Sequence, residues 1–205
     1  MGKELAVIKA EMIPSLPQSL AGLVVGSVQW PGQKTRLHIQ TREGALTEAE
    51  RTEAEATLST LTIALSGSAP FEVEGKIYPG EEAKGILLMK LLRGLAGRQG
   101  SEAEGFAKAE MYGDAIEDLP AWAIDKAVKR WARGECPYSV QEKPNYDFPP
   151  SPATLRKMAL FDMDTPKRDA ARVRALLDCI PIARAMDPKP IPEVRGLLPA
   201  LQRMR

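Results

Sequence analysis

The strongest constraint on this chain is a series of helix-start signals followed by alanine and leucine residues at helical spacing. Thr47 with Glu50 matches a capping box, in which a hydroxyl and a carboxylate satisfy free amide donors at a helix start. A second helix is predicted after the Pro79-Gly80 pair that closes a loop over 67–80. The first two helices each carry an apolar stripe, formed by Ala54, Leu58, Leu61 and Leu65 and by Leu88, Leu91, Leu92 and Leu95.

Two further helices are predicted between residues 101 and 133. Ser101 with Glu104 is another capping box, and Leu119-Pro120 ends the third helix and starts the fourth. The short connection predicts an antiparallel helical hairpin. The buried edges are expected to be Phe106, Ala109, Gly113 and Ile116, with Tyr112 beside them, and then Ile124, Ala127, Val128 and Trp131.

Proline distribution divides the chain. The 17 prolines cluster at 14–31, 137–152 and 181–199, which does not fit one compact bundle. Apolar residues on both sides of Pro31-Gly32 allow a β-hairpin that must either lean on the helices or be partly disordered. His38 is expected to be an ordinary surface or hairpin histidine.

The C-terminal half repeats one helix-start signal twice after a loop at 134–147. Ser151-Pro152 and Thr165-Pro166 each place proline in a first helical turn, so two helices are predicted there. We therefore expect a mainly α protein. Its helical bundle covers residues 47–161, an irregular or β-hairpin arm covers 1–46, and a partly flexible, helical or proline-rich tail covers 162–205.

Composition excludes several kinds of chemistry. Two cysteines, Cys136 and Cys179, and a single histidine cannot supply the four soft ligands of a zinc site, and we expect both thiols to be free. No phosphate-binding loop or nucleophile elbow is present. The acidic residues gather in first helical turns, where the helix dipole favours them. We expect no catalytic residue, metal or cofactor, no membrane span and a cytoplasmic location.

Two basic strips are candidate binding surfaces, although the net charge is only +1. Each could be a solvated helix face or a strip that binds phosphate or a partner protein. The first lies opposite the apolar stripe of the fourth helix, and the second lies in the basic region after residue 166. Their members are Lys126, Lys129, Arg130 and Arg133, and then Arg168, Arg172 and Arg174.

One set of residues goes beyond general helix signals. Tyr112, Leu119-Pro120, Trp122 and Trp131 are followed by Phe148-Pro149-Pro150 immediately before the Ser151 cap. Over residues 101–160 this set resembles the helical domain of phage helicase loader and inhibitor proteins. On this reading Phe148 plugs the open end of the helical hairpin, and Pro149 and Pro150 fix an extended entry to the next helix. Trp122 is expected to pack in the core.

The resemblance implies a phage DNA-replication adaptor without ATPase activity. Such a protein binds a DnaB-type replicative helicase, loads or inhibits it, and contacts an initiator protein through a C-terminal segment, here 162–205. Two other functions remain open from the sequence. One is a phage structural, assembly or regulatory interaction protein, and the other is a small DNA-binding factor that uses the basic strips.

Overall fold

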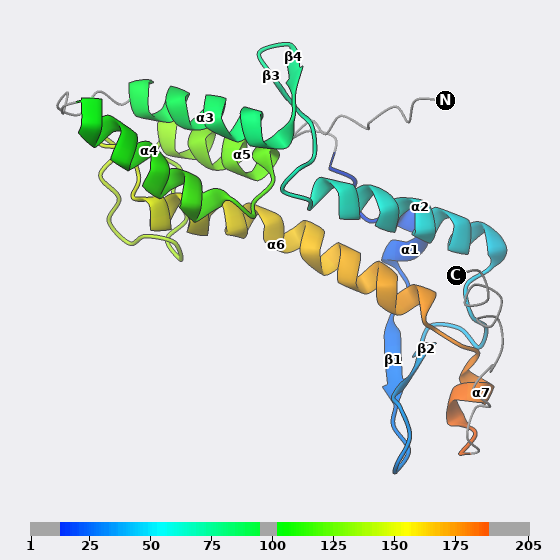
Figure 1. The fold of residues 1–205 in the computed structure, drawn as a ribbon. Coiled ribbons are helices and arrows are strands. Elements are labelled where there is room, and N and C mark those ends of the chain that lie inside the picture. The colour runs from blue at the N-terminus through cyan, green and yellow to red at the C-terminus, as the bar shows by residue number, and fades with distance from the viewer. Residues whose placement is uncertain (1–12, 95–101, 189–205) are drawn as a thin grey trace, which may run out of the picture.

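The chain folds as a mainly α protein with two small antiparallel hairpins (Figure 1). The computed structural model describes residues 13–94 and 102–188, apart from the side chains of Glu102, Ala103, Glu104 and Phe106. The predicted Ser101–Glu104 capping box, the Phe106 and Leu95 core positions and residues 189–205 therefore lie outside the described part. The elements in chain order are α1 (Gln18–Ala21), β1 (Val25–Val28), β2 (Arg36–Ile39), α2 (Glu48–Ala64), β3 (Phe71–Val73), β4 (Lys76–Tyr78), α3 (Gly80–Gly94), α4 (Glu102–Ile116), α5 (Ala121–Ala132), α6 (Pro152–Leu177) and α7 (Ile182–Met186).

Helices α3, α4 and α5 form a bundle with the first half of α6. Helices α4 and α5 each pack against α3 and α6 and lie diagonally across the bundle from one another (Figure 1). The predicted pairing of α4 with α5 as neighbours is therefore wrong. The reason is that α5 is buried on several sides at once, and its alanines allow α3 and α6 to approach closely: Ala121, Ala123 and Ala127 are at most 1% exposed.

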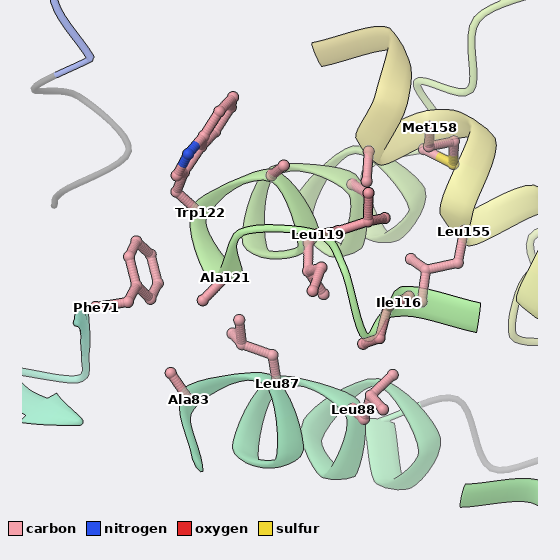
Figure 2. Close-up of a cluster of buried hydrophobic side chains, with 14 of the residues drawn as sticks. Phe71, Ala83, Leu87, Leu88, Ile116, Leu119, Ala121, Trp122, Leu155 and Met158 are labelled. Carbon is pink, nitrogen blue, oxygen red and sulfur yellow. The ribbon is translucent and has the colours of Figure 1, made fainter. Parts of the chain in front are cut away.

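The bundle core collects side chains from every one of these helices. In Figure 2, Leu87 of α3 and Leu119 of the α4–α5 turn point toward the centre, with Leu155 of α6 nearby. Trp122 is 1% exposed, which confirms its predicted place in the core. Its indole Nε1 donates a 2.6 Å hydrogen bond to the carbonyl oxygen of Ala64, so it joins the end of α2 to the start of α5.

A second core lies between α2 and the later half of α6. The Thr47–Glu50 capping box at the start of α2 is present as predicted. Helix α2 then runs along α6, and the N-terminal segment packs beneath them. The buried members of this second core are Leu20, Ile39, Ala54, Val173, Leu176 and Cys179.

The predicted N-terminal β-hairpin is confirmed. Strands β1 and β2 pair from Val25 opposite Ile39 to Val28 opposite Arg36. Gly32 has a φ of +72°, which a side chain would strain, and the Gln33 amide bonds back to the Trp30 carbonyl. The connection thus turns at the predicted Pro31-Gly32 pair.

The hairpin leans on the C-terminal helices and does not stand alone. The Ile180 amide donates to the Leu37 carbonyl at 2.9 Å, and the Arg36 guanidinium donates to the carbonyls of Arg184 and Asp187. His38 is only 5% exposed, so it is a buried hairpin residue and not a surface one. Its Cα partner is Gly26, where an added Cβ would lie 2.7 Å from the His38 ring.

The predicted elements differ from the structure in two regions, α6 and residues 67–80. Helix α6 continues through Pro166, so the second helix start at Thr165 is wrong and the boundary drawn at 161/162 lies within one helix. Proline removes one helical hydrogen bond, but α6 is buried against both cores, and this packing outweighs the lost bond. The loop expected at 67–80 contains the β3–β4 hairpin, in which Glu74 and Gly75 both take positive φ.

Candidate functional site

The segment that links α5 to α6, residues 133–151, is fixed to the bundle by two aromatic side chains. The indole Nε1 of Trp131 donates a 2.9 Å hydrogen bond to the carbonyl oxygen of Phe148. The Tyr112 hydroxyl, from α4, donates to the carbonyl oxygen of Pro150. Because Tyr112 is buried, the pKa of its phenol is raised and the hydroxyl stays a donor. We call this segment the 133–151 loop. Its C-terminal end is therefore held by α4 and α5 together.

The near end of the loop is held by Tyr146, which packs on Trp131. Gly134 takes a φ of +73°, which turns the chain directly after α5. The Tyr146 ring then packs on Trp131, with ring centroids 4.9 Å apart and planes tilted by 59°. The Tyr146 hydroxyl accepts a 3.0 Å hydrogen bond from the Cys136 amide. The near end of the loop is thus held to the Trp131 indole indirectly, through Tyr146.

The predicted start of α6 is confirmed at the end of this loop. The Ser151 hydroxyl accepts from the Thr154 amide at 3.1 Å, and Pro152 occupies the first turn. The Thr154 hydroxyl also donates to the side chain of Gln141 at 3.4 Å, which ties the middle of the loop to the helix start.

Two aromatic rings of the loop nevertheless face solvent. Tyr138 is 72% exposed and Phe148 is 56% exposed. The prediction that Phe148 plugs the bundle is wrong, because its backbone carbonyl, and not its ring, meets Trp131. The Tyr138 hydroxyl donates to the Glu142 carboxylate, and this bond raises the pKa of the phenol.

Every cation of the first basic strip has a neighbouring carboxylate, although Lys126 and Arg130 share one. Arg130 makes a two-pronged ion pair with Asp162 of α6, from Nε at 3.2 Å and from the terminal nitrogen at 3.0 Å. The guanidinium also lies over the Phe161 ring, 5.8 Å from its centroid. The other three cations also have a carboxylate within 4 Å: Lys126 has Asp162, Lys129 has Asp125 and Arg133 has Glu135.

The second basic strip is not continuous. Arg168 pairs with Asp164 at 3.1 Å, and Arg172 donates to the carbonyls of Ala21 and Leu23. Arg172 is thus a structural link between α6 and the N-terminal segment, while Arg174 is exposed. A phosphate backbone would compete with carboxylates or carbonyls at six of the seven predicted cations, so the arrangement offers little support for duplex DNA binding.

A polar pocket of about 430 Å³ lies beside the first strip, between α5, α6 and residues 13–15. Its charged lining is balanced, because Lys126 and Arg130 face Asp162 and Asp169. Asp162 is already bound by Arg130, so the pocket has no net charge that would select an anion or a cation.

Over residues 13–94 and 102–188 no three histidine, cysteine or acidic side chains gather as metal ligands would. Cys136 and Cys179 are both free, as predicted, and burial raises the pKa of each thiol. The helices within these two ranges are all too short or too polar to cross a bilayer.

The sequence interpretation missed Tyr138 and Tyr146. The signal available for them was the placing of two tyrosines in a proline-rich and glycine-containing loop, in a chain with only 5% aromatic residues. Periodicity carries no information on such residues, because they belong to no helix or strand.

Comparison with known proteins found no similar protein. No protein-family model, no curated protein and no solved structure matches the chain.

Proposed function

We propose that this protein is an adaptor without catalytic activity that binds a DnaB-type replicative helicase through the 133–151 loop, and that it loads or inhibits that helicase in phage DNA replication. The observation that carries the binding role is the contrast between a loop fixed by hydrogen bonds and the two rings that it presents to solvent.

This contrast is typical of a protein-binding surface. Covering an exposed aromatic ring with a partner removes a large apolar surface from water, which favours binding. Aromatic residues are also enriched among those that contribute most of the binding energy. A loop that is already ordered loses little conformational entropy when a partner docks. Tyr138 and Phe148 meet the first condition, and the bonds from Trp131 and Tyr112 supply the second.

The choice of a helicase as partner rests on the resemblance. Tyr112 and Trp131 are among the residues that carry the resemblance, and their side chains hold the loop in place. An initiator protein is the expected second partner, through the C-terminal segment, and the protein is expected to act in the cytoplasm. No ATP site is required for this role.

The test is binding and ATPase measurement with a purified DnaB-type hexamer. The protein should co-elute with the hexamer and suppress its ATP hydrolysis. The double variant Tyr138→Ala/Phe148→Ala should weaken binding by at least about a hundredfold, since two aromatic anchors are removed. Unchanged circular dichroism would show that the bundle is intact.

Ile77→Ala is the matched control, because Ile77 is 59% exposed on β4 and lies outside the loop. It should bind like the parent protein. Failure of the parent protein to bind any such hexamer at micromolar concentration would reject the helicase role. Equal binding by the double variant would reject the loop as the contact surface.

A further inference from the structure

We propose that the groove between α3 and α4 is a docking site for the C-terminal segment 189–205 of a second copy of this chain. The groove has a volume of about 380 Å³. Its apolar wall is formed by Leu88, Met89, Leu92, Ala109 and Ile116, and its charged rim by Glu81, Lys84, Asp114 and Glu117. The inference is independent of the helicase role.

Two glycines stand on facing walls of this groove. Gly85 of α3 and Gly113 of α4 both line it, and a Cβ at either position would meet no atom of the described residues within 4 Å. Glycine weakens the interior of a helix, and here no contact within the described chain requires its small size. Space kept open on both walls suits the close approach of another chain.

The rim of the groove favours a positively charged occupant. Lys84 is 3% exposed and is bound by the Glu81 carboxylate at 2.7 Å and by the Glu117 carbonyl. Its charge is therefore already matched within the fold. Asp114 and Glu117 are both exposed on the same rim and leave it acidic.

Residues 189–205 have the complementary chemistry. They carry four basic side chains and one acidic side chain, Glu193. Their apolar side chains can occupy the space that the two glycines leave open in the groove. The basic residues are Lys189, Arg195, Arg203 and Arg205, and the large apolar ones are Ile191, Val194, Leu197, Leu198, Leu201 and Met204.

A second copy is the favoured donor because of distance. The described chain ends after α7, which lies beyond the far end of α6 from α3 and α4 (Figure 1). A helix of this length spans about 39 Å, whereas the extended segment 189–205 reaches at most about 60 Å. Crossing the span would therefore leave only about a third of the segment to lie in the groove. A segment from a neighbouring molecule has no such restriction.

Light scattering of the full chain over a range of concentrations tests this inference. The mass should rise above the 22.4 kDa of the monomer as concentration increases. Gly113→Leu, which fills the groove, and Leu198→Asp, which removes an apolar contact, should each weaken association by about tenfold or more. Gly113→Leu should also raise the melting temperature, because leucine favours a helix, so that loss of association cannot be ascribed to unfolding.

The decisive test exchanges the charges of the groove and of the segment 189–205. Asp114→Lys/Glu117→Lys and Arg203→Glu/Arg205→Glu should each weaken association, and the four changes in one chain should restore it. Glu43→Lys/Glu55→Lys, on exposed positions away from the groove, is the charge-matched control and should associate normally. A monomeric mass at every concentration, association that survives Gly113→Leu, or no recovery in the combined variant would each overturn the proposal.

Discussion

Arg130 of α5 and Asp162 of α6 form a two-pronged ion pair in which the carboxylate is buried and the guanidinium is only partly covered. The Asp162 side chain is 3% exposed and that of Arg130 is 31% exposed. Lys126, at 3.9 Å, is the next cation to this carboxylate. The pair therefore connects the two helices. It also buries the Asp162 carboxylate, which is unfavourable unless a cation stays bound to it.

Removal of Arg130 should leave Asp162 buried without its main partner. We expect Arg130→Ala to lower the free energy of unfolding by about 2–3 kcal/mol, less than for a fully buried pair because the guanidinium is partly solvated. Urea denaturation measures this change. Arg168→Ala is the control, since its ion pair with Asp164 is exposed on both sides, at 71% and 67%, and should contribute less than about 0.5 kcal/mol. Equal effects of the two substitutions would contradict the assignment.

Trp122 should link the end of α2 to the start of α5. Trp122→Phe keeps an aromatic ring but removes the donor to the Ala64 carbonyl, which leaves a buried acceptor unpaired. We expect a loss of about 1–3 kcal/mol in the free energy of unfolding. An unchanged denaturation midpoint would show that this hydrogen bond has no part in stability.

The capping box of α2 should make stability depend on acid pH. The Arg42 guanidinium, followed by the Thr47 amide and hydroxyl, lowers the pKa of Glu50 from 4.5 to about 2. A pKa that is lower in the folded state stabilises the fold above pH 4.5, and this contribution is lost as the pH falls toward 2.

Glu50→Gln tests this contribution, because glutamine can still cap the helix but carries no charge. The variant should be less stable than the parent protein near neutral pH, by about 0.5–1 kcal/mol for an ion pair that is still partly exposed to solvent. The difference should disappear as the pH approaches 2. Denaturation midpoints across this pH range measure it, and a constant difference would contradict the prediction.

Tyr112 should hold the far end of the 133–151 loop. Tyr112→Phe removes the hydroxyl that donates to the Pro150 carbonyl and should cost about 1–2 kcal/mol. Amide hydrogen exchange in residues 145–148 should become faster, while exchange in α2 should stay unchanged. If exchange in the loop were unaffected, Trp131 alone would account for its order.

The sequence predicted the local features of the fold correctly. The Thr47 and Ser151 caps, the turn at Pro31-Gly32 and the mainly α class all follow from residues a few positions apart. The residues that hold the candidate site were also identified, since Tyr112 and Trp131 stood out in the resemblance. What Trp131 holds could not be predicted, because it bonds to a backbone carbonyl 17 residues away.

The sequence by itself determined where helices begin, where turns fall and that helices dominate, because caps, proline and glycine act through bonds within one or two turns of chain. Tertiary structure decided that α6 runs through Pro166, that α4 and α5 lie diagonally, and that the Phe148 ring faces solvent. These outcomes depend on which distant surfaces bury one another. Burial energy is not directional and depends on the whole set of contacts, so no short pattern of residues encodes it.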